Sequence, residues 1–229
     1  MNEWEEQTGV LEFRGSDAVR FLNGQVTQDV RKAAPDGIAI PSCVTDAKGR
    51  LQFRIWIAQR RESGSLLIFT TKHGLEALEA RLTRYLIADD VEVRDVSGEV
   101  DPGSYEFPGL RYNELERIEQ GIPKWGAELV EGMLPPEAGL DATDISYHKG
   151  CYIGQEVISR IRSAGKVNRR LVKLKFDGEG KIGEFTHADG KICGEVTSVS
   201  GSIGLGYLKR SAEGESEFLI DGVRVELRS

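Results

Sequence analysis

The chain has 229 residues and a formal net charge of −7, with 39% hydrophobic and 29% charged residues, an ordinary composition for a globular protein. No apolar run reaches the roughly 18 residues of a membrane-spanning helix. The acidic start MNEWEEQTGV lacks the basic and apolar regions of a signal peptide. We therefore expect a cytoplasmic protein without a membrane partner.

The first hundred residues alternate between helix and strand patterns. Residues 17–22 predict a short helix with an N-cap at Gly15-Ser16 and a C-terminal glycine, Gly24. Two β-rich runs separated by a five-residue turn predict a hairpin, and a third run predicts a central strand; these runs are 38–44, 50–58 and 65–70.

Residues 73–88 have the clearest helical pattern, because the following apolar residues recur on one face: Leu75, Leu78, Leu82, Tyr85 and Leu86. Residues 91–96 return to strand alternation. This order of elements predicts an α+β fold with helices layered on a largely antiparallel sheet.

The second half of the chain changes in character. Residues 97–112 are rich in turn residues and predict irregular structure, and 114–120 predict a short helix ended by Gly121. Later segments predict strands: 169–176 with Val172, Leu174 and Phe176 facing inward, 191–198, 202–208, and a hairpin at 219–225 with an Asp-Gly turn. We expect an α+β domain over 1–165 and a small β-barrel over 166–229.

The eight residues KGCYIGQE at 149–156 hold the densest set of reactive side chains. They predict a loop at 148–153 that leads into a helix from about Gly154 to Ser163. Cys151 then precedes a helix N-terminus, where the dipole and the charge of Lys149 favour a thiolate. The alternative is that Cys151 is a small buried apolar residue and that Gly150 and Gly154 only turn the chain.

Two further patterns concern metals and anions. Cys43, Cys151 and Cys193 are far apart and odd in number, which excludes a disulfide framework and a C-x-x-C motif. We expect no stably bound metal. Residues 149–175 hold eight basic residues against one acidic residue, which indicates an anionic partner or simply the solvated face of a strand. The acidic remainder of the chain disfavours nucleic-acid binding over the whole surface.

KGCYIGQE resembles the signature of the folate-binding YgfZ-like proteins, which are relatives of the glycine-cleavage T protein, an aminomethyltransferase. The resemblance also covers the segments 17–30, 117–126, 137–148 and 165–171, and hence nearly the whole chain. It implies a T-protein-like folate-binding domain followed by a C-terminal β-barrel, with a shortened central subdomain near 97–112.

The resemblance also implies a tetrahydrofolate site. Glu119 in the segment Arg117-Ile118-Glu119-Gln120-Gly121 matches the carboxylate that holds the pterin, since one carboxylate accepts two adjacent N–H donors. Its alternative is an ordinary solvated glutamate. The other expected cofactor-binding residues are Arg117, Trp125, Lys149, Tyr152, Gln155 and Arg160. Gln155 and Glu156 can instead cap the first helical N–H groups.

The T-protein family uses an aspartate in a segment that matches residues 68–75 here, but no aspartate occurs between Asp46 and Asp89. The resemblance therefore implies a non-catalytic, folate-dependent accessory protein for iron-sulfur cluster assembly or repair in client enzymes, with indirect effects on tRNA modification. Cys151 is its expected reactive thiol or transient cluster ligand; a cluster needs about four ligands, so a partner supplies the rest.

Two alternatives stay open. One is a folate-dependent one-carbon transferase or demethylase of the aminomethyltransferase superfamily that uses Glu156 or Asp29 as its acid. The other is direct tRNA binding through the basic stretch 149–175, which requires salt-sensitive affinity.

Overall fold

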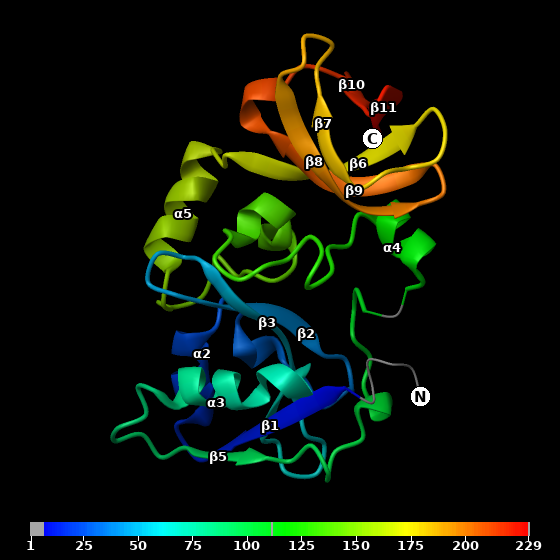
Figure 1. Cartoon of the computed structure of the whole chain (residues 1–229). Helices are drawn as coiled ribbons and strands as arrows, with labels where there is room; N and C mark the ends of the chain where they lie inside the picture. Colours follow the sequence, from blue (N-terminus) through cyan, green and yellow to red (C-terminus); the bar gives the residue numbers. More distant parts are fainter. Residues whose placement is uncertain (1–6, 111, 229) are drawn as a thin grey trace. The chain divides into compact units, whose positions relative to one another are not determined.

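A computed structural model of the chain describes residues 7–110 and 112–228 (Figure 1). The described residues fall into two compact units. One contains the chain up to Pro108 together with Asp141–Ser159, and the other contains Gly109–Leu140 and the chain from Arg160 onward. The expected division into domains at residues 165 and 166 stays a prediction.

The first unit is built on a five-stranded antiparallel sheet with the strand order β2-β3-β4-β1-β5. Its strands are β1 (Thr8–Arg14), β2 (Ile40–Thr45), β3 (Leu51–Gln59), β4 (Leu66–Thr71) and β5 (Glu92–Asp95). β4 is the central strand, as the sequence predicted. β1 was not predicted. It is buried on both faces, so its side chains do not alternate between apolar and polar, and it contains the fully buried Glu12.

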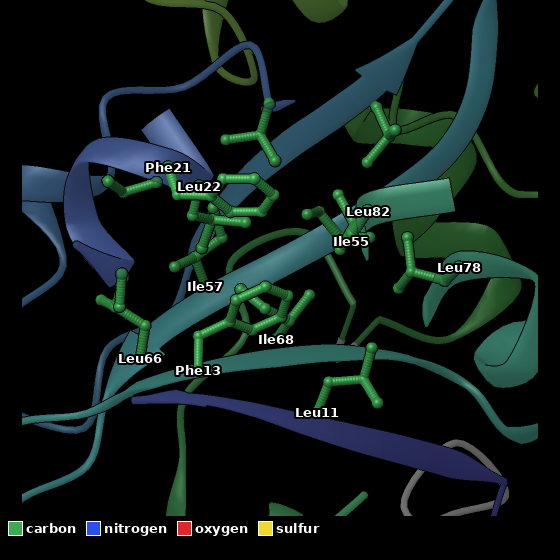
Figure 2. Packing of buried hydrophobic residues seen from close by; sticks show 14 of the residues in the cluster. Leu11, Phe13, Phe21, Leu22, Ile55, Ile57, Leu66, Ile68, Leu78 and Leu82 are labelled. Carbon is green, nitrogen blue, oxygen red and sulfur yellow. The ribbon is translucent and has the colours of Figure 1, made fainter. Parts of the chain in front are cut away.

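Helices pack on the sheet to form the core of this unit (Figure 2). They are α2 (Ala18–Gln25) and α3 (Leu75–Thr83), with short 3-10 turns at η1 (Val30–Lys32), η2 (Lys72–Gly74) and η3 (Pro102–Ser104). Figure 2 shows Phe21 and Leu22 of α2 and Leu78 of α3 against strand residues such as Phe13 and Ile68. The predicted α+β fold is thus confirmed.

The predicted ends of both helices are wrong. α2 continues through Gly24 to Gln25 and ends at the extended residue Val26, and the side chains of Ser16 and Asp17 before it bond to Asp90 instead of capping the helix. α3 ends at Thr83 rather than near residue 88. Tyr85 is 49% exposed, and Arg81 and Arg84 lie over its ring. At α2, contacts distant in sequence, not local periodicity, decide where the helix ends.

The second unit begins with α4 (Glu114–Gln120), which matches the prediction. Asn113 and Glu116 form a reciprocal capping box, and the left-handed Gly121 ends the helix. The 3-10 turn η4 (Pro135–Ala138) follows in this unit, whereas η5 (Leu140–Ala142) and α5 (Gln155–Ala164) each contain residues of both units. Among the described residues, no helix is long and apolar enough to cross a membrane.

Six strands close into a barrel in the order β10-β11-β6-β9-β8-β7. They are β6 (Arg169–Phe176), β7 (Gly183–Thr186), β8 (Ile192–Ser200), β9 (Ile203–Lys209), β10 (Glu217–Ile220) and β11 (Val223–Arg228), with η6 (Arg210–Ala212) after β9. The predicted inward-facing residues of β6 are buried, and Asp221 and Gly222 form the predicted turn with positive φ. Only the four-residue strand β7 was not anticipated within the barrel.

Candidate functional site

The first five residues of the motif, 149–153, form a loop before α5 that we call the arch. Lys149 and Tyr152 are only 8% and 7% exposed, whereas Gly150 and Cys151 between them are exposed. Cys43 and Cys193 are buried. The alternative that Cys151 is a small buried residue is therefore wrong, and Cys151 is the cysteine of this chain that solvent and partners can reach.

The ammonium group of Lys149 is fully engaged by backbone. Its Nζ donates hydrogen bonds to the carbonyl oxygens of Asn23, Val26 and Gln28 at 2.6, 2.8 and 2.8 Å. A lysine has three N–H donors, so each of them has an acceptor here. The expected role of Lys149 in binding a cofactor stays a prediction, but the structure uses its charge to hold the segment after α2.

Burial lowers the pKa of Lys149 to about 7, because the ammonium loses its hydration. Asp29 opposes this shift, while Arg31 adds to it. The guanidinium of Arg31 donates to both carboxylate oxygens of Asp29, at 2.8 and 2.7 Å, and these bonds lower the pKa of Asp29. Asp29 is thus already paired with a cation.

The depressed pKa of Lys149 predicts a specific pH dependence of stability. Between about pH 7 and about pH 10.4 the unfolded chain keeps a proton on this lysine that the folded protein has released, so the free energy of unfolding rises with pH. Lys149→Met is expected to flatten this rise. Urea unfolding at several pH values in that interval measures it, with exposed Lys48→Met as the control; equal slopes in the two variants would contradict the assignment.

Tyr152 anchors the other side of the arch. Its ring packs with Ile145 and Ile158 in a small apolar cluster, and the Nζ of Lys149 lies 5.2 Å from the ring centroid. Burial raises the pKa of Tyr152. Among the residues that the structure describes, its buried hydroxyl has no hydrogen-bond partner. This hydroxyl can therefore serve a bound molecule or a water.

The two glycines of the motif differ in their constraints. Gly154 has a φ of +91°, and a Cβ atom there would lie 2.5 Å from the carbonyl oxygen of Asp46 in the β2–β3 turn. Thr45 of the same hairpin donates a hydrogen bond to the carbonyl oxygen of Ile153 at 2.6 Å. Gly154 is therefore required by close packing. A Cβ at Gly150 would meet open space.

A buried ion pair fixes the segment that leads into the motif. The guanidinium of Arg54 on β3 donates to both carboxylate oxygens of Asp144, at 2.8 and 3.2 Å, and Asp144 is fully buried. The hydroxyl of Thr27 donates to the carbonyl oxygen of Asp144, and the Ser146 N–H donates to that of Thr27. The sequence did not indicate this pair, since its members are 90 residues apart.

The helix after the arch begins one residue later than predicted, at Gln155. The backbone N–H of Gln155 bonds to the carbonyl oxygen of Tyr152 at 3.2 Å. Gln155 is partly buried, and Glu156 and Arg160 are exposed on the same helix. The expected contacts of Gln155 and Arg160 with a cofactor stay predictions, as does the role of Glu156 as an acid.

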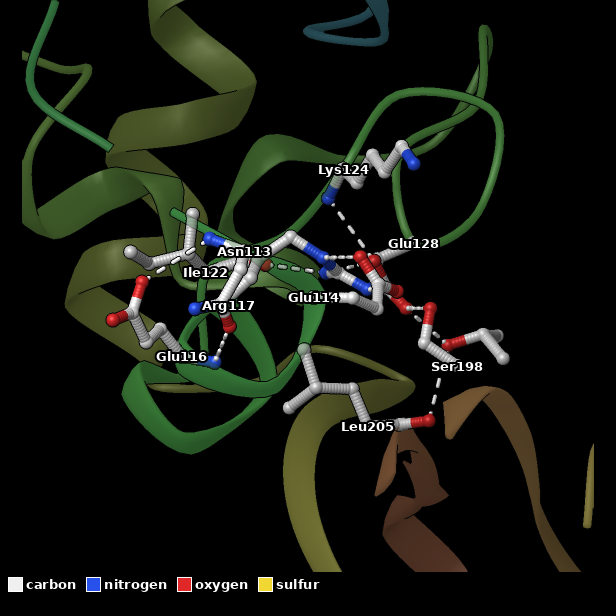
Figure 3. A network of polar contacts seen from close by, with 10 residues as sticks. Asn113, Glu114, Glu116, Arg117, Ile122, Lys124, Glu128, Ser198 and Leu205 are labelled. Carbon is white, nitrogen blue, oxygen red and sulfur yellow. Dashed lines mark hydrogen bonds and ion pairs between the residues drawn. The ribbon is translucent and has the colours of Figure 1, made fainter. Parts of the chain in front are cut away.

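Arg117 lies in a buried polar network of the second unit (Figure 3). Its Nη1 donates to the carboxylate of Glu128 at 2.8 Å and to the carbonyl oxygen of Ile122 at 2.6 Å, and its Nε and Nη2 donate to Glu114 at 2.9 and 2.7 Å. Arg117 was expected to bind a cofactor, and that role stays a prediction. In this structure its guanidinium holds α4 in place.

Glu128 is the centre of the same network and was not anticipated from the sequence. It is 1% exposed, and its carboxylate also accepts hydrogen bonds from the Lys124 N–H and from the hydroxyls of Thr197 and Ser198 on β8. Figure 3 shows these contacts converging on Glu128. A lone glutamate in a loop is normally solvated, so no local signal could have identified it.

Glu119 and Trp125 are presented to solvent. The Glu119 side chain is 46% exposed on the last turn of α4, with one carboxylate oxygen 4.0 Å from Nη1 of Arg228. Trp125 is also exposed. The expected site residues are divided between the two units. The second unit contains Arg117, Glu119, Trp125 and Arg160, and the first contains Lys149, Cys151, Tyr152 and Gln155.

Three further observations limit the chemistry. Within residues 7–110 and 112–228, no group of three or more His, Cys, Asp or Glu residues could hold a metal ion. The place that the resemblance assigns to the T-protein aspartate is the end of β4, where Thr70, Thr71 and Lys72 stand. Not all basic residues of the stretch 149–175 are available to an anionic partner, because Lys149 is buried and Arg169 forms an ion pair with Glu137 at 3.0 Å.

Sequence comparisons find relatives over parts of the chain. Residues 168–229 match the family model described as the CAF17 C-terminal beta-barrel domain. A putative chloroplast transferase of Arabidopsis thaliana is 39% identical over 48% of this chain and 26% of its own length. The mouse mitochondrial iron-sulfur cluster assembly factor IBA57 is 36% identical over 41% of this chain and 28% of its own length. The chain thus spans under a third of these two relatives.

Other matches cover most of the chain. An uncharacterized protein of Haemophilus influenzae is 25% identical over 77% of this chain and 75% of its own length. The crystal structure of glycine cleavage system aminomethyltransferase T from Bartonella henselae superposes with a TM-score of 0.77, over 97% of this chain and 83% of that one, at 14% identity. The chain therefore has the fold of the aminomethyltransferase, is similar over part of its length to iron-sulfur cluster assembly factors, and carries at residues 168–229 a barrel that matches the CAF17 C-terminal domain.

Proposed function

We propose that this protein is an accessory factor for the assembly or repair of iron-sulfur clusters in client enzymes, with Cys151 as its working group. The observation that carries the proposal is the exposed Cys151 held between two buried residues, while Cys43 and Cys193 are buried. The similarity to a mouse protein named as an iron-sulfur cluster assembly factor supports the same role.

In this proposal the cluster is cargo, not a resident cofactor. Iron-sulfur clusters are generally held by about four thiolates or equivalent ligands. The described part of the chain contributes one exposed thiol and no group of three metal-binding side chains. The client or another assembly protein therefore supplies the remaining ligands while Cys151 contributes one ligand or a redox-active thiol.

The test is reconstitution of an apo [4Fe–4S] enzyme from a cluster-loaded donor protein, with and without this protein. The proposal expects a faster or more complete recovery of client activity and of the cluster absorbance when the protein is present. Recovery that does not depend on the protein across several [4Fe–4S] clients would overturn it.

We also propose that tetrahydrofolate binds this protein. The exposed carboxylate of Glu119 can accept the paired N–H donors of the amino-pyrimidinone ring, because its ion pair with Arg228 is long, at 4.0 Å. When bound, the folate supplies one-carbon or reducing chemistry.

Glu119→Ala is expected to weaken tetrahydrofolate binding by about tenfold to a hundredfold, the effect of losing a charge-assisted bidentate contact. Calorimetric titration of the purified protein measures this. Glu131→Ala, which changes an exposed glutamate elsewhere in the same unit, is the control. Equal affinity in the two variants would exclude Glu119 as the pterin anchor, and no binding in the unsubstituted protein would exclude folate itself.

A second candidate function is folate-dependent one-carbon transfer. The name of the Arabidopsis relative, a putative transferase, favours it, as does the aminomethyltransferase fold. The chain has threonines and a lysine where the resemblance expects the aspartate, and Asp29 is paired with Arg31. The acid of this candidate is Glu156, which is exposed. Formation of methylenetetrahydrofolate from an aminomethyl or methylamine donor tests this candidate.

The last two inferences concern the cellular location of the protein and its effect on tRNA modification. We infer that the protein works in the cytoplasm and that its absence changes tRNA modification through cluster-dependent enzymes. Direct tRNA binding requires an affinity that falls steeply with salt. A binding assay at low and physiological salt separates direct from indirect effects.

A further inference from the structure

The exposure pattern of the arch has a structural cause on each side of Cys151. The side chains of Lys149 and Tyr152 both turn into the protein, and the ammonium of Lys149 lies 5.2 Å from the centre of the Tyr152 ring. The two residues are three positions apart, so their contact closes a short loop. Gly150 and Cys151 are left on the outside of that loop.

The inner side of the arch rests on the C-terminal end of α2. This helix has no basic residue in its last turn and ends at the extended Val26, so it has neither a charged side chain of its own nor a glycine cap at that end. Residues of the arch supply both a cation and an N–H donor to this helix end. Lys149 donates to the carbonyl oxygens of Asn23 and Val26, and the Ile153 N–H donates to that of Gly24 at 3.3 Å.

These contacts also satisfy the electrostatics of the helix end. The last carbonyl groups of a helix have no partners within it and carry partial negative charge, so a cation there is favourable. The third bond of Lys149, to the carbonyl oxygen of Gln28, extends the same clamp to the turn before η1. The cradle for the ammonium is made entirely of backbone carbonyl groups.

We infer that Lys149 is a positioning residue for Cys151. Its ammonium clamps the arch to the end of α2 and thereby holds the thiol outward in one conformation. This rests on the proposed function and deepens it, since it gives the outward position of the exposed thiol a cause, but the physical claim can be tested without any client. Lys149 does not contact the cargo; it acts through the backbone that carries Cys151.

The test uses a nitroxide spin label attached to Cys151 of the full chain. Cys43 and Cys193 are buried, and a Cys151→Ser sample verifies that they stay unlabelled. At about pH 6, where Lys149 keeps its proton, we expect a restricted spectrum in the unsubstituted protein and a dominant mobile component in Lys149→Met. Hydrogen exchange at the Ile153 amide is expected to accelerate by about tenfold, because a charge-assisted hydrogen bond is lost.

Chemical rescue separates positioning from general destabilisation. In Lys149→Ala the three carbonyl groups remain, so methylammonium is expected to restore the restricted spectrum, whereas the bulky tetramethylammonium, which has no N–H donors, is expected not to. Exposed Lys48→Met is the matched control and is expected to leave the spectrum unchanged. Lys149→Gln, which keeps two donors, is expected to give an intermediate spectrum if the shorter variants fold poorly.

The outcomes distinguish the two proposals. An unchanged spectrum and unchanged exchange in folded Lys149→Met or Lys149→Gln would overturn the positioning role. A mobile label that is rescued by methylammonium, together with full client activity in Cys151→Ser, would leave the positioning role standing and remove the proposed function of the thiol.

Discussion

Cys151→Ser is expected to reduce reconstitution of an apo [4Fe–4S] client to the level seen without this protein. Sulfur is the soft ligand that iron-sulfur chemistry requires, and a serine hydroxyl is neither a comparable iron ligand nor redox-active. The residue is exposed, so the free energy of unfolding is expected to change by no more than about 0.5 kcal/mol. Client activity and urea unfolding, measured on the same preparation, check both statements.

The control for this prediction is chemical. Brief treatment of the unsubstituted protein with iodoacetamide alkylates exposed thiols first, and Cys43 and Cys193 are buried. The alkylated protein is expected to behave like Cys151→Ser. Full support of the client by either sample would remove the thiol from the mechanism and shift attention to the folate-dependent alternatives.

Glu128→Ala is expected to cause the largest loss of stability among single substitutions of polar residues in the second unit. It leaves the buried guanidinium of Arg117 without one of its two carboxylates, and it removes the acceptor for Lys124, Thr197 and Ser198. Breaking a buried ion pair on one side typically costs about 3–5 kcal/mol. Chemical denaturation followed by circular dichroism measures the change.

Two variants calibrate that result. Glu128→Gln keeps the shape and part of the hydrogen bonding, so its loss is expected to be smaller, and exposed Glu131→Ala is expected to stay within about 0.5 kcal/mol of the unsubstituted protein. If Glu128→Ala were no less stable than Glu131→Ala, the network in Figure 3 would not hold α4 and the loop after it to the barrel.

The elements that the sequence predicted well are those with local causes. The helix Glu114–Gln120 begins at a capping box and ends at a left-handed glycine, and β6 alternates between inward apolar and outward residues. The turn at Asp221 and Gly222 needs positive φ, which these residue types tolerate. Each signal lies within a few residues of its effect.

The elements that were missed have causes far away in the chain. β1 is covered on both faces, and its Glu12 is neutralised by Arg14 and by Arg60. α2 ends where residues of the arch, more than 120 positions later, meet its last carbonyl groups. A short stretch of sequence around β1 or α2 does not reveal these partners, because strand pairing and capping by distant side chains depend on the fold itself.

The candidate site shows the same division. The sequence by itself determined the motif, the presence of a thiol beside a helix start and the absence of an aspartate between Asp46 and Asp89. Only the tertiary structure decided that Cys151 is exposed while Lys149 is buried, and that Arg117 is bound by Glu128 rather than free. The reason is physical: residue type sets what a side chain can do, but burial and the partners brought by distant segments decide which of those abilities are already used within the fold.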